Sequence, residues 1–227
     1  MVSAFQHYLL SKLKASEKLL NFVATIYNFK TSFFLKGSKC NQIQYAGAFL
    51  KTTTIQISGS NNIITIAPKV RMINCLLNIH GNNCKINIEP YCSFKNVEFW
   101  IEDDGSQIII ENRTTIEGGH LASTEGKTIK IGNDCMFSNH IEIRNGDSHS
   151  ILSTESSLRI NPAKEVIIGN HVWLGSDVKV LKGSVIKDGS IIGTGSLVSG
   201  LVDANSIYAG IPAKKVKEKV SWKRDRK

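Results

Sequence analysis

Hydrophobic positions between residues 166 and 204 recur every six residues. The first position of six consecutive hexads is aliphatic, at Ile168, Leu174, Val180, Ile186, Ile192 and Val198. The fifth position is small in each hexad, at Val172, Val178, Ser184, Ser190, Ser196 and Val202. An α-helix repeats every 3.6 residues and a half-buried strand every 2, so a strict period of six fits neither as a long element. Short strands joined by tight corners fit the pattern, and three such sides close one coil of a parallel β-helix.

A looser form of the repeat extends upstream, over residues 55–143. Four segments align with IGNHVWL (168–174), and the first three of them begin 22 residues apart: IAPKVRM (66–72), IEPYCSF (88–94), IENRTTI (110–116) and IGNDCMF (131–137). This spacing predicts wider coils with longer corners, stacked against the regular coils that follow Ile168. The repeat therefore predicts one elongated solenoid over residues 41–213.

The repeat is interrupted by one large insertion. A hexad start at Ile143 would put the next one at 149, but the next clean start is Ile168, 25 residues after Ile143. About nineteen residues are therefore inserted, over about 144–165. Insertions in a solenoid form loops on one face, often the functional face.

His149 lies at the root of this insertion, with Asp147 two residues before it. A neutral imidazole is suited to removing a proton from a hydroxyl near neutral pH. Among the other histidines, His120 follows two glycines and is placed to reach a groove. His140 and His171 share the fourth hexad position, where a side chain is expected to face outward. No convincing nucleophile for a covalent intermediate is present, so direct transfer to an acceptor is the simpler chemistry.

Charge is concentrated at the two ends of the chain. Of the formal net charge of +9, residues 1–39 carry +5 and residues 214–227 carry +6, so the body is slightly acidic. The aromatic residues are not interleaved with Lys and Arg, which argues against a nucleic-acid binder. Apolar residues at mostly helical spacing predict an N-terminal helical cap over 1–40, with a peripheral membrane surface as the alternative. Residues 214–227 are expected to form a basic C-terminal helix or tail.

The five cysteines form no CxxC pair and no metal-like spacing, so no metal is expected. Cys92 and Cys135 occupy the small fifth position of hexads and are expected to point inward as reduced thiols. Reduced thiols, together with the absence of a recognisable leader or membrane-spanning run, predict a cytoplasmic protein, with the inner membrane face as a peripheral location.

Three segments resemble the hexapeptide-repeat acyltransferases, and in particular the polysaccharide and sugar O-acetyltransferases. They are GDSHSI (146–151), IGNHVWLGSDV (168–178) and YAGIPAKKV (208–216). The resemblance implies an all-β, left-handed parallel β-helix with an N-terminal helical segment, a loop insertion and a short C-terminal helix. It also implies a homotrimer whose active sites form between neighbouring subunits.

The resemblance further implies roles for individual residues. His149 matches the general base of the family, and Trp173 matches a residue lining the acceptor and cofactor groove. Contacts to acetyl-CoA are implied for Ser176, Thr194, Ser199, Gly200, Lys214 and Lys217. The pair Ser199-Gly200 replaces the more usual Thr-Lys, so the likeness is weaker there.

We therefore expect an acetyl-CoA-dependent O-acetyltransferase acting on a sugar hydroxyl of a surface polysaccharide, such as a capsule, or of its precursor. N-acetylation of an amino nucleotide-sugar would need the same base and is the nearest alternative. A non-catalytic β-helix binding module is the alternative from another class, because fold does not imply function.

Overall fold

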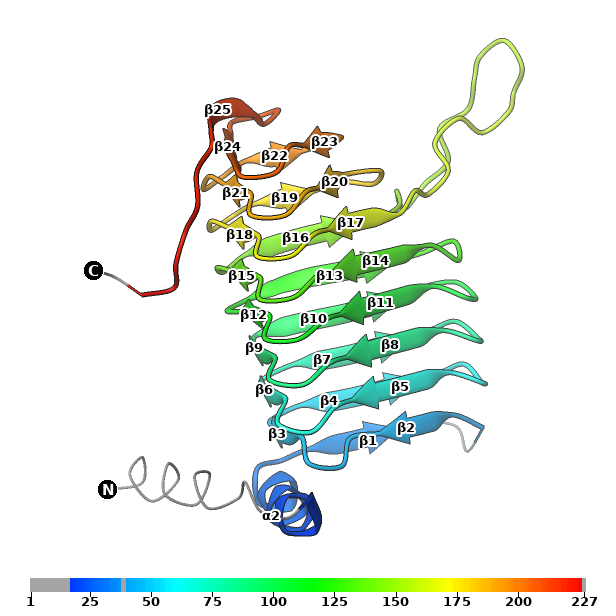
Figure 1. The fold of residues 1–227 in the computed structure, drawn as a ribbon. Coiled ribbons are helices and arrows are strands. Elements are labelled where there is room, and N and C mark those ends of the chain that lie inside the picture. Colours follow the sequence, from blue (N-terminus) through cyan, green and yellow to red (C-terminus); the bar gives the residue numbers. More distant parts are fainter. Residues whose placement is uncertain (1–16, 38–39, 226–227) are drawn as a thin grey trace.

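The computed structural model describes residues 17–37 and 40–225, which form a parallel β-helix preceded by one helix (Figure 1). Each coil contributes one strand to each of three sheets, here named sheets A, B and C in chain order.

Sheet A contains β1 (Phe34–Lys36), β4 (Thr54–Ile57), β7 (Leu76–Ile79), β10 (Val97–Ile101), β13 (Gly119–Ser123), β16 (Ile141–Arg144), β19 (Lys179–Val180) and β22 (Leu197–Val198). Sheet B contains β2 (Gln42–Gln44), β5 (Ile63–Ile66), β8 (Lys85–Ile88), β11 (Gln107–Ile110), β14 (Thr128–Ile131), β17 (Val166–Ile168), β20 (Val185–Ile186) and β23 (Leu201–Val202). Sheet C contains β3 (Phe49–Lys51), β6 (Arg71–Ile73), β9 (Ser93–Lys95), β12 (Thr115–Ile116), β15 (Met136–Phe137), β18 (Trp173–Leu174), β21 (Ile191–Ile192), β24 (Ser206–Ala209) and β25 (Lys214–Glu218).

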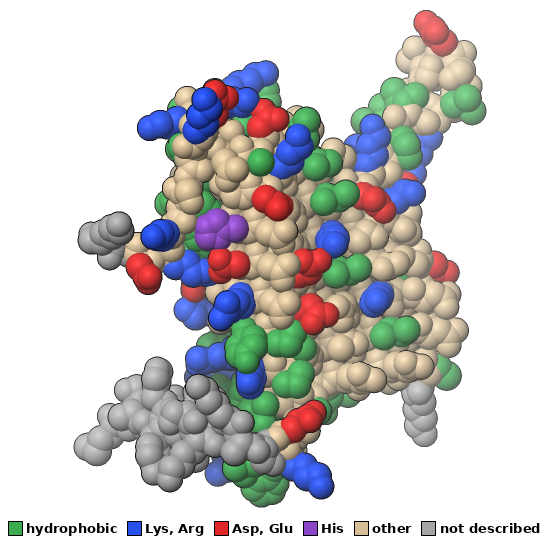
Figure 2. Space-filling model, viewed as in Figure 1, with side chains coloured by type: hydrophobic (Ala, Val, Ile, Leu, Met, Phe, Trp, Pro, Cys, Tyr) green, Lys and Arg blue, Asp and Glu red, His purple; other side chains and the backbone are tan. Residues whose placement is uncertain are grey.

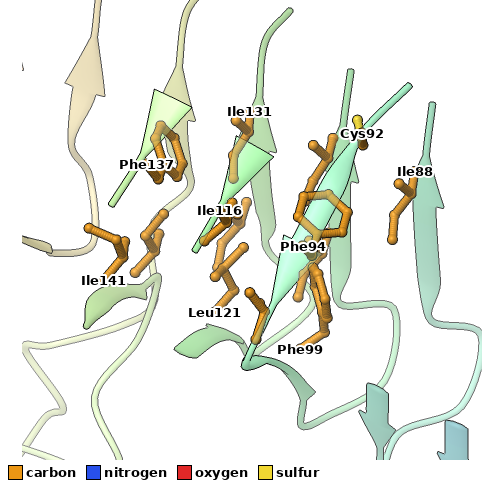
Figure 3. Packing of buried hydrophobic residues seen from close by; sticks show 14 of the residues in the cluster. Ile88, Cys92, Phe94, Phe99, Ile116, Leu121, Ile131, Phe137 and Ile141 are labelled. Atoms are coloured by element: carbon orange, nitrogen blue, oxygen red, sulfur yellow. The ribbon is translucent and has the colours of Figure 1, made fainter. Parts of the chain in front are cut away.

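The interior of the solenoid is filled by the residues that the repeat predicts. All six aliphatic first positions and all six small fifth positions of the hexads after Ile168 are buried. In the wider coils, aromatic rings fill the extra space, and Phe94 packs edge-on against Phe99 with ring centroids 5.5 Å apart (Figure 3). Cys92 and Cys135 point inward as predicted, and burial raises the pKa of each thiol to about 12.

The N-terminal helix α2 (Glu17–Lys30) covers the open end of the first coil. Leu20 and Ala24 are buried, and the side chain of Asn28 joins the helix to the coil. Its Nδ2 donates to the carbonyl oxygen of Ala48 over 3.0 Å, and its Oδ1 accepts from the amide of Leu50 over 2.7 Å. The helix thus satisfies polar groups at the end of the solenoid. The rest of the expected cap, residues 1–16, lies outside the described residues, and β1 already pairs with β4 within the range expected to be helical.

The expectation of a short C-terminal helix is wrong. Residues 214–218 form β25, which runs antiparallel to β24, the last parallel strand of sheet C. The outer edge of β24 would otherwise expose unpaired backbone groups, and an added strand satisfies them where a helix could not. The chain then turns back and runs down the side of the solenoid (Figure 1).

No helix among residues 17–37 and 40–225 is both long and apolar enough to span a membrane.

Candidate functional site

Residues 145–165 leave the coil between β16 and β17 and project from the solenoid as a long arm (Figure 1). Its two sides are joined by backbone hydrogen bonds, from the amide of Ile160 to the carbonyl of Ile151 and from Ser153 to Leu158, both over 2.8 Å. Hydrophobic side chains lie along it (Figure 2), and four of them are more than half exposed: Ile151, Leu152, Leu158 and Ile160. The arm therefore presents apolar surface away from the body of its own chain.

Asn161 is a buried polar residue that holds the root of this insertion together. Its Nδ2 donates to the carbonyl oxygen of His149 and to Oδ2 of Asp147, each over 2.8 Å, while its Oδ1 accepts from the amide of Ile151. Lys182 donates to the same Asp147 oxygen over 2.5 Å. These hydrogen bonds, that from Lys182 foremost, hold the pKa of Asp147 below its usual range. Asp147 is thus engaged by Lys182 and Asn161.

His149 itself is exposed at this root, and its main chain is fixed by Asn161. Within the described chain, none of the recorded hydrogen bonds involves its imidazole. The backbone enters the insertion through Gly146, where a Cβ would lie 2.2 Å from Cγ2 of Thr124, so the path requires glycine. The side chain of His149 is therefore exposed to solvent on a backbone that is held in place.

Two adjoining hollows border this root on the outer face of sheet A. The first, of about 310 Å³, extends toward β10 and includes Trp100 and His120 in its wall. The second, of about 420 Å³, extends toward the C-terminal end and includes Lys182 and Ser199. Both are lined by Arg144, Gly146, Asp147 and Ser148. We refer to the two together as the sheet A groove; the residue before His149 lies in its wall.

His120 lies within this groove, as its position after two glycines suggested. Burial lowers the pKa of its imidazole, because desolvation disfavours the charged form. Its Nε2 lies 3.7 Å from Oε2 of Glu98, its neighbour on β10.

Trp173 lies on sheet C, away from the sheet A groove of the same chain. It is 38% exposed, and its ring centroid is 6.1 Å from that of Trp222. His149 follows sheet A, at the corner that leads to sheet B. One copy of the chain therefore does not bring these two residues into a common groove.

Trp222, the neighbour of Trp173, belongs to residues 219–225, here called the C-terminal strap, whose contact with sheet C was not predicted. Trp222 stacks on His171 with ring centroids 3.9 Å apart, and its Nε1 donates to the His171 carbonyl oxygen over 2.8 Å. Arg224 donates to Oδ1 of Asp134, while Nδ1 of His171 pairs with Oδ2 of the same carboxylate. His171 thus faces outward as expected but is covered by the strap. A lone tryptophan in an otherwise basic tail was the available signal.

The residues expected to contact acetyl-CoA lie around the C-terminal coils, on different sides of sheet A. Ser176 and Thr194 occupy corners that lead from sheet C into sheet A, and Ser176 Oγ hydrogen-bonds Ser138 Oγ over 2.9 Å. Ser199 and Gly200 occupy the corner between β22 and β23, where Ser199 lines the second hollow. Lys214 and Lys217 are exposed on β25, where Lys and Arg gather (Figure 2).

Comparison with known proteins identifies related chains. Residues 165–200 match the family model described as bacterial transferase hexapeptide (six repeats). A polysialic acid O-acetyltransferase of Neisseria meningitidis is 37% identical over 131 residues, which is 58% of this chain and 60% of that protein. A polysialic acid O-acetyltransferase of Escherichia coli O1:K1 is 36% identical over 53% of this chain and 39% of its own length. The alignments with these two curated relatives thus span 60% or less of their length.

Similarity to solved structures covers most of the chain. The polysialic acid O-acetyltransferase OatWY superposes with a TM-score of 0.82 at 31% identity, covering 86% of this chain and 93% of that one. The polySia-specific acetyltransferase NeuO gives a TM-score of 0.77 at 31% identity, covering 86% and 90%. The left-handed β-helix is confirmed by this likeness. The chain therefore belongs to the hexapeptide-repeat acyltransferases, within which it is similar to the polysialic acid O-acetyltransferases.

Proposed function

We propose that the protein is an O-acetyltransferase that moves an acetyl group from acetyl-CoA to a sugar hydroxyl of a surface polysaccharide or its precursor, in the cytoplasm. One observation carries the proposal: in a chain of this family, His149 stands at the edge of the sheet A groove on a backbone fixed by Asn161. The names of the related proteins support a polysaccharide as the acceptor.

In the proposed reaction His149 is the general base. The sugar hydroxyl oxygen attacks the thioester carbonyl carbon while the imidazole takes the hydroxyl proton. The tetrahedral intermediate then collapses, the carbon–sulfur bond breaks, and the imidazolium returns the proton to the leaving CoA sulfur. No covalent acetyl-enzyme is needed, and the cysteines of the core, Cys92 and Cys135, are buried with raised pKa values.

The donor is proposed to lie along the C-terminal coils. Ser176, Thr194, Ser199 and Gly200 would border the pantetheine arm, and Lys214 and Lys217 would meet the phosphates of CoA. Neither lysine makes an ion pair within the described residues, whereas Lys215 between them is paired with Asp203 over 2.7 Å. Two unpaired ammonium groups at one end of the solenoid suit a polyanionic nucleotide.

The working enzyme is proposed to be a homotrimer, with Trp173 of one subunit completing a site at His149 of another. The separation of Trp173 and His149 on different faces of one chain supports this, because a single copy cannot assemble both. The exposed apolar residues of the arm and of sheet B, among them Ile167 and Leu201, support it as well. Contiguous exposed apolar surface is typical of an interface between subunits.

The test is a transfer assay with acetyl-CoA and a panel of surface glycans that includes polysialic acid, scored by mass spectrometry. His149→Ala should lower kcat roughly 10²–10⁴-fold, as expected for a general base. Its KM for acetyl-CoA should change little. His140→Ala, at an exposed corner histidine, serves as the matched control. Near-normal kcat in His149→Ala, with loss in His120→Ala, would move the base to His120.

A further inference from the structure

The first hollow of the sheet A groove contains chemistry that the transfer reaction leaves unused. Its wall holds an aromatic ring, two carboxylates and a histidine from two neighbouring coils, at Trp100, Glu98, Glu102 and His120. Its volume of about 310 Å³ falls at the lower end of the range of small-molecule sites, roughly 300–1,000 Å³. Ser148, the residue before His149, lies in its wall, so an occupant would lie near the root that carries the proposed base.

The aromatic rings form a row along the outer face of sheet A. Trp100 lies between His80 and His120, with ring centroids 4.8 Å and 6.5 Å away. The three residues come from successive coils, and because Trp100 is in register with Asn78 and His120 with Glu98, the row crosses the strands of sheet A diagonally. Trp100 is half-buried, and the part of its indole that faces the hollow offers a flat apolar surface on which the C–H face of a sugar ring can stack.

Most charged groups in and beside this hollow have an oppositely charged neighbour, and Glu98 and Glu102 leave the balance slightly negative. Glu142 is shared by Arg144 and Lys179, over 2.5 Å and 3.4 Å, and Asp147 is held by Lys182 over 2.5 Å. Glu98 has only the distant His120 as an ion-pair partner, and burial lowers the pKa of that histidine and so favours its neutral form. Glu102 makes no ion pair within the part of the chain that the structure describes. Carboxylates accept strong hydrogen bonds from hydroxyl groups but repel other carboxylates.

We infer that this hollow is a subsite for uncharged sugar residues of the acceptor glycan, stacked on Trp100 and hydrogen-bonded to Glu98 and Glu102. A segment of sialic acid residues, each with a carboxylate, does not suit it. The inference rests on the proposed function and narrows its acceptor: the glycan carries neutral residues next to the one that is acetylated. In this respect the chain would differ from the polysialic acid enzymes that it resembles.

Binding tests the subsite without relying on catalysis. Saturation-transfer NMR on the full-length protein would compare neutral oligomers of glucose, N-acetylglucosamine and N-acetyllactosamine with oligosialic acid of the same length. Neutral oligomers should bind, and Trp100→Ala should weaken them about tenfold, the factor that corresponds to a loss of about 1.4 kcal/mol. Phe29→Ala, which removes a 90% exposed ring on α2, should change nothing. Absence of Trp100-dependent binding by every neutral oligomer would reject the subsite.

Removing the charge of the two carboxylates is a second test, in which the affinities for neutral and for acidic oligomers should change in opposite directions. Glu98→Gln with Glu102→Gln should weaken neutral oligomers several-fold and strengthen oligosialic acid, because repulsion is removed while the shape is kept. Tighter binding of oligosialic acid than of all neutral oligomers by the wild type would also overturn the inference.

Kinetics then separates the subsite from the reaction. For neutral acceptors that are turned over, Trp100→Ala should raise the acceptor KM about tenfold and leave kcat and the KM for acetyl-CoA unchanged. An unchanged acceptor KM with active enzyme would reject the subsite and leave the O-acetyltransferase function standing. Trp100-dependent binding without acetyl transfer to any acceptor would support the subsite and reject the O-acetyltransferase function.

Discussion

Asn161 donates a hydrogen bond from its side-chain Nδ2 to the backbone carbonyl oxygen of His149 over 2.8 Å, and so joins the two ends of the insertion. Because Asn161 is buried and also holds Asp147, removing its amide would leave several polar groups without partners.

Asn161→Ala is expected to lower kcat at least tenfold, with little change in the KM for acetyl-CoA, because the backbone that carries the imidazole would no longer be fixed. The free energy of unfolding should fall by about 1–3 kcal/mol. Steady-state kinetics and chemical denaturation measure the two effects. Ser156→Ala, in the same insertion but away from its root, is the control. Normal kcat in a destabilised Asn161→Ala variant would mean that Asn161 only supports the fold.

The C-terminal strap should be released by acid. Burial opposes ionisation of Asp134, but the hydrogen bonds from His171 and Arg224 outweigh it and hold the pKa of this carboxyl below its usual value. A carboxyl whose pKa is lower in the folded state stabilises the protein fully above its unfolded pKa, about 3.9, and loses this effect as the pH falls through the folded value.

Asp134→Asn should therefore lower Tm at pH 7, and the difference from the wild type should shrink as the pH falls below about 4. Thermal melts between pH 7 and pH 3 would follow it. Asp177→Asn, which removes an exposed partner of His140, should show a smaller difference throughout. A difference in Tm between the wild type and Asp134→Asn that stays constant with pH would contradict the lowered pKa of Asp134.

The thiols of Cys92 and Cys135 should be inert in the folded protein. With pKa values raised by burial to about 12, only about one thiol in ten thousand is ionised at pH 8, and neither is accessible. Alkylation followed by peptide mass spectrometry should label exposed Cys40 first and reach the other two only in denaturant. Rapid labelling of either core cysteine with loss of activity would point to a catalytic thiol.

Lys214 and Lys217 are expected to bind the phosphates of acetyl-CoA. The double variant Lys214→Ala with Lys217→Ala should raise the KM for acetyl-CoA several-fold to tens-fold and spare kcat, since exposed charge pairs contribute about 1 kcal/mol or less each. Added salt should narrow the difference. An unchanged KM combined with weaker sedimentation on anionic lipid vesicles would instead assign these lysines to a membrane surface.

The sequence predicted the solenoid because its signal is local and repeated. Ile168 and Leu174 each predict a short strand from a pattern only six residues long, and both positions are buried in the structure. The strap could not be foreseen in this way, because Trp222 meets His171 across 51 positions without any recurring pattern. The interpretation of residues 214–218 as helical failed since the open edge of β24, a tertiary feature, determines their conformation.

The repeat also made one part of the candidate site predictable, namely the position of His149. His149 stands out because it interrupts a period, whereas Trp100 occupies an outward-facing strand position that the repeat does not constrain. Its position beside His80 and His120 appears only when successive coils are stacked.

Stacked coils also constrain how such a scaffold can change in length. Side chains bond between equivalent corners 22 positions apart, as where Nδ2 of Asn82 donates to Oδ1 of Asp104. Loss or gain of a residue within a strand would disturb this register, whereas a corner can absorb it: β10 and β13 pair 22 positions apart and β11 and β14 pair 21 apart. A whole coil could likewise be added or removed with its neighbours still matched. The row of outward-facing side chains on sheet A would then grow in steps of about 4.8 Å, the spacing of neighbouring strands. If the sheet A groove binds the acceptor as proposed, the number of coils limits the length of glycan that this face can accommodate, whereas the length of the arm does not depend on the coil repeat.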